Sequence, residues 1–235
     1  MTTTLLSAQD VEVTFGGVRA LDGLTLNVTD EHHLWGLIGP NGSGKSTFFN
    51  LVTGLCKASR GTVGGTALRR RSRRVVALGR TFQSPRVFGR MTVAENLLAV
   101  SGGMSRREAR DRAEELLTLL RLTGVVDRRA GELSIGQQKL VELARALLRR
   151  PELVLLDEMA AGVHPDLRGE IAGHLRRLAD QGSRFVIIEH DMALLLDLCT
   201  RVFCLAQGRL LAEGTPDEMR RNERVVAEYL GAGHV

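Results

Sequence analysis

The chain has 235 residues, of which 43% are apolar and 25% charged, and its formal net charge is +5. This length suits one compact α/β domain with an insertion, or two small domains, and the composition is ordinary for a soluble globular protein. No apolar stretch approaches the ~20 residues that cross a bilayer, and no N-terminal segment has the order of a signal peptide. We therefore expect a cytosolic chain, unless a partner holds it at a membrane.

Arginine supplies nearly all of the positive charge, because only three of the 32 basic residues are lysine, namely Lys45, Lys57 and Lys139. Two explanations stay open, a lineage bias in codon usage or attraction to nucleic acid or acidic lipid. The densest run, residues 69–74, has no interleaved aromatic residue, and seven Phe, one Trp and one Tyr are few for stacking bases. A solvated edge is the favoured interpretation of this run, and no nucleic-acid partner is expected.

The three cysteines, Cys56, Cys199 and Cys204, are an odd number and contain no C-x-x-C pair. A disulfide framework or a zinc site is therefore not expected. Each cysteine is interpreted as a small buried apolar residue.

The N-terminal part of the chain predicts three strands, a loop and a helix. Residues 5–14 and 18–28 have the pattern of two strands around the turn Gly16-Gly17. A buried strand is predicted at 34–38, a loop at 39–43, and a helix from Gly44 to about Leu55. Strand, glycine loop and helix are the context in which a phosphate-binding loop works.

Residues 84–132 differ in character from the segments on either side. The segment 91–100 has the pattern of a helix, and Ser105 with Glu108 has the spacing of a capping box. The next helix places arginines and glutamates on one face and apolar residues on the other; the apolar residues are Ala109, Ala113, Leu116, Leu117 and Leu120. We predict an inserted helical subdomain over 84–132, within a single domain of residues 5–231.

From Gly136 onward, helices and strands alternate. Helices are predicted at 136–149, 167–180 and 193–199, and strands at 153–156, 185–188 and 202–205, followed by a further strand and helix. Two of these strands, 153–156 and 185–188, are apolar without alternation, which is typical of strands buried on both faces of a parallel sheet.

The segment Gly39–Ser46 matches the pattern G-x-x-x-x-G-K-[ST] without exception. Backbone N–H groups of such a loop and of the next helix converge on phosphate oxygens, and a side chain at Gly42 or Gly44 would hinder that approach. Lys45 would reach the β- and γ-phosphates, and the Ser46 hydroxyl would be a Mg²⁺ ligand. The segment predicts a nucleoside triphosphate site but not what the nucleotide is used for.

Asp157 and Glu158 end an apolar strand. A carboxylate at the C-terminal end of a buried parallel strand can hold Mg²⁺ through water, and an adjacent carboxylate can accept a proton from an attacking water. The alternative is a charged strand end that faces solvent.

Two further polar residues follow strand-like or loop segments. His190 comes directly after the strand at 185–188 and Glu189, where its ring could donate to a γ-phosphate. Gln83 carries an amide that could orient water or contact Mg²⁺. A lone histidine or glutamine more often has a structural role. The predicted functional roles of His190 and Gln83 therefore rest on their positions in the chain.

The segment Leu133-Ser134-Ile135-Gly136-Gln137 precedes a strong helix. Ser134 can cap that helix, which is the simpler interpretation. The helix start with Ser134 and Gly136 can equally be a second anion site. Two phosphate-binding helix starts far apart in one chain suggest a ligand shared across a dimer.

Taken in this order, the motifs resemble the ATP-binding subunit of an ABC transporter, over about residues 5–231. Within that family the resemblance is strongest to the ATPases of branched-chain amino-acid importers. The segments that carry it are 15–18, 37–42, 80–83, 136–138, 160–162, 189–192 and 227–231. The implied fold is α/β, a P-loop NTPase (RecA-like) core with an antiparallel β subdomain and an inserted α-helical subdomain.

The resemblance also implies roles for particular residues. Glu158 would be the general base, with Lys45, Gln83 and the γ-phosphate switch His190 as the other catalytic residues. Phe15 would stack on adenine, and the phosphates would contact Gly39, Pro40, Asn41, Gly42, Ser43, Gly44, Lys45, Ser46 and Thr47. Ser134, Gly136 and Gln137 would contact the γ-phosphate held by the opposite subunit, and Mg²⁺ would be held by Ser46, Gln83 and Asp157.

The implied function is ATP hydrolysis that drives import through a membrane permease, contacted by Gln83 and residues 84–91, at the cytoplasmic face of the membrane. A second ATPase subunit, either a copy or a paralogue, and an extracytoplasmic solute-binding protein complete the implied set of partners. Other cargoes stay open, among them urea, other amino acids, aromatic acids and lipid-linked molecules. So does a non-transport ABC ATPase acting on nucleic acid, whereas a small-molecule kinase has no reason for the segment 133–137 together with His190.

The chain departs from the family pattern at some positions. Met159 stands where the family usually has proline, and Ile135 replaces the second glycine of the signature. Residues 61–74 and the helical insertion are shorter than in typical relatives.

Overall fold

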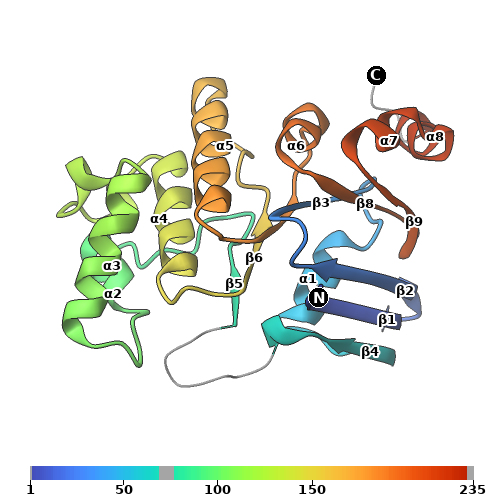
Figure 1. Cartoon of the computed structure of the whole chain (residues 1–235), viewed down its shortest axis with the longest axis horizontal. Helices are drawn as coiled ribbons and strands as arrows, with labels where there is room; N and C mark the ends of the chain where they lie inside the picture. Colours follow the sequence, from blue (N-terminus) through green and yellow to red (C-terminus); the bar gives the residue numbers. More distant parts are fainter. Residues whose placement is uncertain (1, 69–76, 232–235) are drawn as a thin grey trace. The chain divides into compact units, whose positions relative to one another are not determined.

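The structure is a computed structural model that describes residues 2–68 and 77–231. The arginine-rich run 69–74 lies outside the described residues. The described chain forms two compact units, one of residues 2–68 and 184–231 and the other of residues 77–183. In the figures the chain can be followed by colour from blue to red (Figure 1).

The first unit contains a three-stranded antiparallel sheet in the order β2-β1-β4. Its strands are β1 (Thr4–Phe15), β2 (Val18–Thr29) and β4 (Arg60–Gly64). The hairpin between β1 and β2 turns at Gly16 and Gly17, whose φ angles of 52° and 91° favour glycine. The two predicted N-terminal strands are confirmed, whereas β4 was not predicted, because its sequence Arg-Gly-Thr-Val-Gly lacks an apolar pattern.

The same unit contains a second sheet, in which parallel strands are followed by one antiparallel strand. The strands lie in the order β7-β3-β8-β9 and are β7 (Phe185–Ile188), β3 (Leu34–Ile38), β8 (Arg201–Ala206) and β9 (Arg209–Gly214). All residues of β3 and β7 are buried, as their unbroken apolar sequences predict. Trp35 of β3 stacks on Phe203 of β8 with 4.9 Å between ring centroids.

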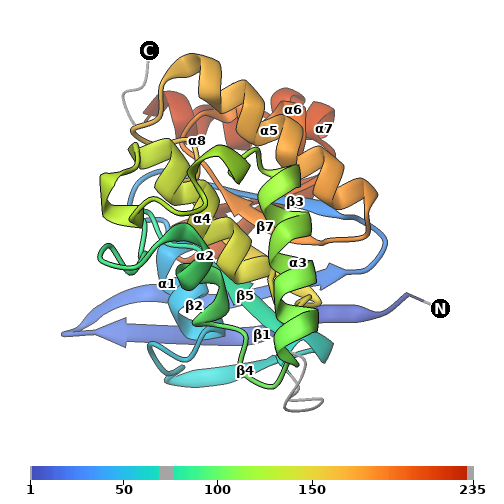
Figure 2. The ribbon, with the colours of Figure 1, turned by 90° about the vertical axis from the view of Figure 1, so that its left-hand side faces the viewer.

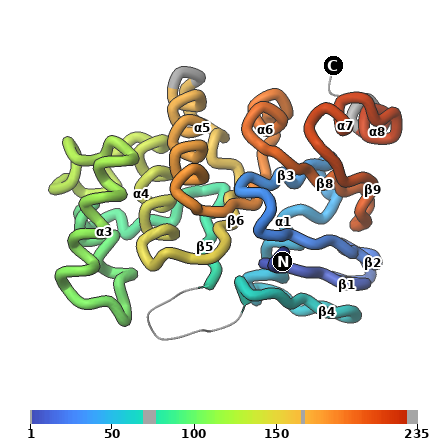
Figure 3. The backbone as a smooth tube through the Cα atoms, in the orientation of Figure 1, coloured from blue at the N-terminus to red at the C-terminus, as the bar shows by residue number. Residues whose placement is uncertain are grey.

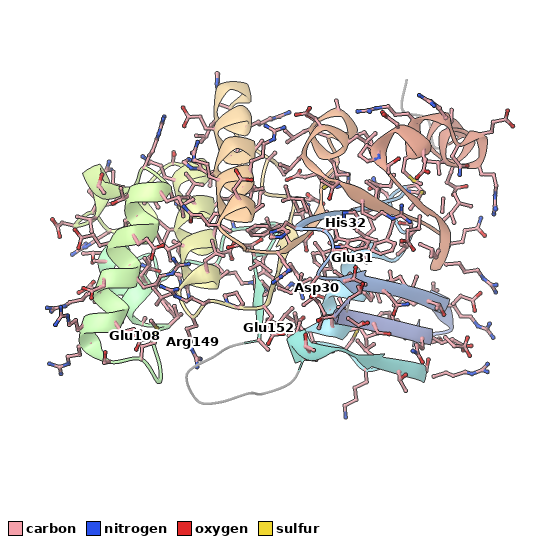
Figure 4. The ribbon with its side chains drawn as sticks, in the orientation of Figure 1. Asp30, Glu31, His32, Glu108, Arg149 and Glu152 are labelled. Carbon is pink, nitrogen blue, oxygen red and sulfur yellow. The ribbon has the colours of Figure 1, made fainter. Side chains whose placement is uncertain are left out.

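The connection from β2 to β3 carries Asp30, Glu31 and His32, which Figure 4 shows together at this turn. Asp30 accepts a hydrogen bond from the backbone N–H of Thr3 at 2.7 Å, which ties the start of β1 to the end of β2. His32 lies edge-on to Trp35 with 5.2 Å between ring centroids. His32 thus lies in the connection between two strands, and its contacts there are structural.

Four α-helices complete the described part of the first unit: α1 (Lys45–Val52), α6 (Met192–Leu198), α7 (Pro216–Arg221) and α8 (Glu223–Gly231). A short 3₁₀ turn, η1 (Thr66–Leu68), follows β4. Helix α1 ends three residues before the predicted end, because the Thr53 hydroxyl donates back to Phe49 O at 2.8 Å and Gly54 has φ 75°. Helices α7 and α8 contact each other and β9 (Figure 3).

The second unit has two parallel strands, β5 (Leu78–Arg80) and β6 (Leu153–Asp157). Its helices are α2 (Val93–Leu98), α3 (Arg106–Leu119), α4 (Ile135–Leu147) and α5 (Pro165–Asp180), with 3₁₀ turns η2 (Thr123–Val125) and η3 (Ala130–Glu132). Figure 2 shows α2, α3 and α4 gathered together, and these helices contact one another. Strand β5 was not predicted, because three residues are too few to show a period.

Residues 84–132 contain helices and turns, with one isolated bridge between Thr92 and Arg129. The Ser105 hydroxyl caps α3 by accepting from Glu108 N at 3.2 Å. The predicted apolar face of α3 is buried at each of Ala109, Ala113, Leu116, Leu117 and Leu120. The bounds of an inserted subdomain at 84 and 132 stay a prediction.

Two of the three cysteines are buried as predicted, whereas Cys56 is only half-buried. Burial raises the pKa of the Cys204 thiol to about 12 and also raises that of Cys199. These thiols are therefore unreactive near neutral pH. No helix in the described parts of the chain has the length and apolar character needed to cross a bilayer.

Candidate functional site

The phosphate-binding loop joins β3 to α1, and its shape depends on glycines. Gly39 and Gly44 have φ angles of 151° and 104°. A Cβ atom would lie 2.2 Å from Leu205 O at Gly39 and 2.6 Å from Ala20 O at Gly44. These backbone neighbours cannot move aside easily, so the loop requires glycine at both positions.

Polar groups within this loop fit a triphosphate. The Lys45 ammonium is buried and donates to Gly39 O at 2.7 Å and to Pro40 O at 3.0 Å. The Ser43 hydroxyl is buried with no hydrogen-bond partner among the described residues. A buried hydroxyl without a partner is costly, and a phosphate oxygen would satisfy it. Ser46 lies exposed in the first turn of α1, and Thr47 is half-buried.

A cavity of about 830 Å³ opens beside the phosphate loop within the first unit. The residues around it are Gly39, Pro40, Asn41, Glu189, His190, Met192, Leu196, Met219, Arg220, Val225 and Val226. The structure therefore brings the predicted switch histidine to the same cavity as the start of the phosphate loop. His190 is exposed, and the next residue, Asp191, caps α6 by accepting from Leu194 N at 3.0 Å.

Phe15 lies at the end of β1 and is 53% exposed. An exposed aromatic ring is costly to leave in water and offers a face on which a base can stack. Its contact with adenine stays a prediction.

The second unit joins Gln83 to Glu158. Gln83 Nε2 donates to Glu158 Oε2 at 2.7 Å, although the two residues are 75 apart in the chain. Glu158 is buried, directly after β6, so a carboxylate and an amide meet at the C-terminal end of a buried strand. This pair can hold and activate a water molecule.

Asp157 is buried at the last position of β6. Arg80 Nη2 lies 3.6 Å from its carboxylate, and both side chains are 8% exposed. Its backbone N–H donates to Thr81 Oγ1 at 3.2 Å. Asp157 is therefore fixed at the strand end, and its ion pair with Arg80 was not predicted.

Two charged residues of α4 hold the segment that contains Gln83. Glu142 is buried and accepts from Arg86 N at 2.9 Å and from Phe82 N at 3.3 Å. Burial raises the pKa of this carboxyl group, although the two backbone donors oppose that rise. The Arg145 side chain donates to Arg86 O and lies 4.5 Å from the centroid of the Phe88 ring.

Asn96 of α2 holds the next part of the same segment. It is fully buried, accepts from Phe88 N at 2.8 Å, and donates to the carbonyl oxygens of Phe88, Met91 and Thr92. Phe88 itself is 47% exposed. The segment thus presents an aromatic ring on a fixed backbone.

The signature segment forms the start of α4. Ser134 Oγ accepts from Gln137 N at 3.3 Å, and Gln137 Oε1 accepts from Ser134 N at 3.2 Å, which completes a capping box. A Cβ atom at Gly136 would lie 2.2 Å from Leu167 Cδ2, so Gly136 packs closely against α5 and a larger residue would require the Leu167 side chain to shift. Ile135 is 48% exposed. These contacts are structural, and the role of the segment toward a nucleotide stays a prediction.

The predicted site residues are divided between the two units. The first unit holds Phe15, Gly39–Thr47 and His190, and the second holds Gln83, Ser134, Gly136, Gln137, Asp157 and Glu158. The predicted Mg²⁺ ligands Ser46, Gln83 and Asp157 are therefore split and stay a prediction. Among the residues described, no three His, Cys, Asp or Glu side chains gather as a metal site.

Sequence reasoning missed four residues that support these groups, namely Arg80, Asn96, Lys139 and Glu142. Lys139 and Glu142 interrupt the apolar pattern of α4 beside Leu140, Val141 and Leu143. A charged residue at a helix position that the period predicts to be buried is the signal that could have found them.

A family model described as ABC transporter matches residues 21–161. The chain belongs to the ABC transporter family. A second model, described as branched-chain amino acid ATP-binding cassette transporter, matches residues 209–235 of this cassette. Both matches confirm the predicted family, and the cassette is a nucleotide-binding protein.

Curated relatives align over nearly the whole cassette. A probable branched-chain amino acid transport ATP-binding protein, LivG, from Methanocaldococcus jannaschii is 35% identical, and 98% of each chain is covered. The high-affinity branched-chain amino acid transport ATP-binding protein LivG of Escherichia coli K12 is 34% identical, with 98% of this chain and 99% of the relative covered.

Solved structures confirm the fold. The ADP conformation of an ATP-binding cassette of an ABC transporter superposes with a TM-score of 0.81 at 34% identity, covering 98% of this chain and 99% of the other. A dimeric cassette in a post-hydrolysis state, bound to ADP and Pi, has a TM-score of 0.76 at 27% identity, covering 90% and 98%.

Proposed function

We propose that this cassette is the ATP-hydrolysing subunit of an importer, with ATP and Mg²⁺ as its ligands and branched-chain amino acids as the cargo of the assembled transporter. The observation that carries the hydrolytic role is the hydrogen bond from Gln83 to the buried carboxylate of Glu158. The family and the buried, unsatisfied Ser43 hydroxyl of the phosphate loop support nucleotide binding.

The proposed reaction uses each group in its chemical capacity. Glu158 accepts a proton from water as the water oxygen attacks the γ-phosphorus, and the bond to the β–γ bridging oxygen breaks to leave ADP. Lys45 and the loop N–H groups stabilise the charge that develops on the phosphates. Mg²⁺, with Ser46, Asp157 and Gln83 as the proposed ligands, would neutralise phosphate charge. His190 would respond to the presence of the γ-phosphate.

A second cassette completes the proposed active form, with Ser134, Gly136 and Gln137 closing over the nucleotide of the neighbour. Support comes from the dimeric cassette among the similar structures and from the exposed Ile135 beside Ser134. A helix N-terminus with free N–H groups favours a phosphate. The second subunit is either a copy of this chain or a paralogue.

The proposed permease contact is the segment 84–91, where Phe88 is exposed on a backbone held by Asn96 and Glu142. This contact would hold the cassette at the cytoplasmic face of the membrane. An extracytoplasmic solute-binding protein would deliver cargo to the permease. The printed names of the relatives and the match over residues 209–235 support branched-chain amino acids as that cargo.

The variant Glu158→Gln tests the hydrolytic role. It should abolish ATP turnover and trap an ATP-dependent dimer, measured by phosphate release and by size-exclusion chromatography with light scattering. Glu152→Gln is the matched control, because Glu152 lies just before β6 (Figure 4), at the other end of the strand from Glu158. A strict monomer at saturating ATP, or full turnover in Glu158→Gln, would contradict the proposal.

The cargo is tested separately on the assembled transporter. Uptake of radiolabelled leucine and of urea is measured in vesicles that contain the co-purified permease and this cassette. ATP-dependent uptake of leucine alone is expected, and uptake of urea alone would overturn the assignment of cargo.

A further inference from the structure

The turn after β6 places Glu158 in an unusual backbone conformation. Its φ angle is 52°, a left-handed value that a residue with a side chain adopts only when its surroundings hold it there. Within the turn, Ala161 N donates to Glu158 O at 3.2 Å. The next residue is Met159, whose own φ angle is not restricted by a ring as that of proline would be. A contact from outside the turn can hold Glu158 in this conformation.

A buried lysine of α4 supplies that support. Lys139 is 1% exposed, and its ammonium donates to Glu158 O at 2.5 Å and to Ala161 O at 2.8 Å. Burying an ammonium group is costly unless its protons find acceptors, whereas methionine would fill a similar volume without that cost. The Lys139 ammonium thus links α4 to the two carbonyl groups of this turn, and its charge also acts on the nearby Glu142.

Helix α4 holds the other half of the catalytic pair as well. Glu142, three residues after Lys139, accepts from the backbone on both sides of Gln83, at Phe82 and Arg86. Gln83 in turn donates to the Glu158 carboxylate. One helix thus supports both partners of the hydrogen bond that the proposed reaction depends on.

Ser134 caps the N-terminus of the same helix, and Lys139 lies five residues, about 1.4 turns, further on. A displacement of the N-terminus of α4 would therefore move Lys139, and the two hydrogen bonds of Lys139 would transmit that movement to the turn of Glu158. Under the proposed function, Ser134 at one end of this connection and Glu158 at the other act on different nucleotides. Ser134 contacts the ATP of the neighbouring cassette, and Glu158 acts on the ATP of its own.

We infer that Lys139 is a positioning residue: it links the orientation of the Glu158 side chain to the contact between the N-terminus of α4 and the ATP of the neighbouring cassette. In this way Lys139 couples hydrolysis of the cassette's own ATP to binding of the neighbour's ATP. This inference rests on the proposed function of Glu158 and Ser134. Coupling between two sites appears as a Hill coefficient above 1 in the dependence of ATPase rate on ATP concentration.

The test is Lys139→Met in the full-length chain, with Lys139→Arg as the conservative variant and Lys57→Met as the matched control at an exposed lysine. We expect kcat to fall about 100-fold in Lys139→Met, as for a misplaced catalytic group, and the Hill coefficient to fall toward 1. Binding of a fluorescent ATP analogue and the melting temperature should stay close to wild type. Lys139→Arg, which keeps charged donors, should recover part of both losses.

A Lys139→Met variant with wild-type kcat and Hill coefficient would overturn the inference, and so would a loss of kcat with an unchanged Hill coefficient. If Lys139→Met does not fold, Lys139→Gln replaces it, and the same two readouts decide. The Glu158→Gln variant separates this result from the proposed function. If it forms no ATP-dependent dimer, the proposed function fails; if it dimerises while Lys139→Met behaves as wild type, only the role of Lys139 fails.

Discussion

The phosphate loop of the first unit and the Glu158 turn of the second unit both use left-handed backbone, but they hold it by different means. The loop uses glycine, at Gly39, Gly42 and Gly44, and its lysine donates to carbonyl groups five and six residues away. The turn uses a glutamate held by Lys139 and Gln83, which are 19 and 75 residues distant. The acceptors of Lys45 are thus local to the loop, although Gly39 and Gly44 also pack against the distant backbone atoms Leu205 O and Ala20 O. The carboxylate and the carbonyl group of Glu158, in contrast, accept hydrogen bonds from side chains of other elements.

The largest effect is expected from Gly44→Ala, which disrupts the phosphate loop. The added Cβ would lie 2.6 Å from Ala20 O, and the φ of residue 44 is 104°. The loop must therefore shift, and its N–H groups would no longer point at the phosphate oxygens. Losing two charge-assisted hydrogen bonds of about 1.5–3 kcal/mol each weakens ATP binding more than ~100-fold. Calorimetric titration with ATP measures this change.

Gly54→Ala is the control for backbone strain. Gly54 has a φ of 75°, and nothing lies within 4 Å of an added Cβ at this position. The Gly54→Ala variant should therefore lose roughly 1–2 kcal/mol of stability but keep its affinity for ATP. Equal ATP affinities in the two variants would show that the loop tolerates a side chain at Gly44.

Gln83→Ala removes one of the tertiary contacts of Glu158, the hydrogen bond from the Gln83 amide. Glu158 loses the donor 2.7 Å from its carboxylate, so the water that Glu158 is proposed to activate would be less well placed. We expect kcat for ATP to fall roughly 100-fold with little change in ATP affinity. Steady-state phosphate release gives kcat, and the exposed Gln181→Ala serves as the control glutamine. A tenfold or larger loss of ATP affinity would instead assign Gln83 to nucleotide binding.

Two serine caps sharpen the distinction between structure and function. Ser105 and Ser134 both cap helices, so alanine at either should lower the free energy of unfolding by about 1 kcal/mol, measured in urea. Only Ser134→Ala should also slow ATP hydrolysis, because Ser105 has no predicted nucleotide contact. Equal ATPase rates in the two variants would leave Ser134 with its capping role alone.

The last expected effect is a dependence of stability on pH, and it comes from the buried His174 of α5 in the second unit. Burial, the nearby Arg177 and, to a lesser extent, Arg121 lower the pKa of this histidine, against a hydrogen bond with the Leu119 backbone and the charge of Glu170. Arg177 Nη2 lies 2.7 Å from His174 Nδ1. Below pH ~6.5 the unfolded chain takes up a proton that the folded chain does not, so acid lowers stability.

Through His174 the free energy of unfolding should fall by at most about 1.4 kcal/mol for each pH unit, between pH ~6.5 and the lowered pKa of His174 in the folded chain. Urea unfolding between pH 7 and 5 measures it, and His174→Gln should flatten this part of the curve. An identical pH dependence in the variant would show that other groups titrate there.

Much of the fold could be predicted from local pattern. The strands β1, β2, β3, β6, β7 and β8 were predicted from apolar runs, and α3 from its period and its cap. Strands β4 and β5 were missed, because each is short and is defined by its pairing with β1 or β6 rather than by its own composition. The end of α1 was placed too late, since a single threonine and a glycine decide it.

The sequence by itself determined the family, through the order of its motifs, and the phosphate loop, whose pattern lies within consecutive residues Gly39–Ser46. It also named candidate catalytic residues, which stay a prediction. Only the tertiary structure showed that Gln83 meets Glu158, that Glu142 holds the segment around Gln83, and that Lys139 holds the Glu158 turn. Hydrogen bonds between distant residues leave no periodic trace in a single sequence. A lysine at a buried helix position is visible as an anomaly, but its acceptors are decided by how the chain packs.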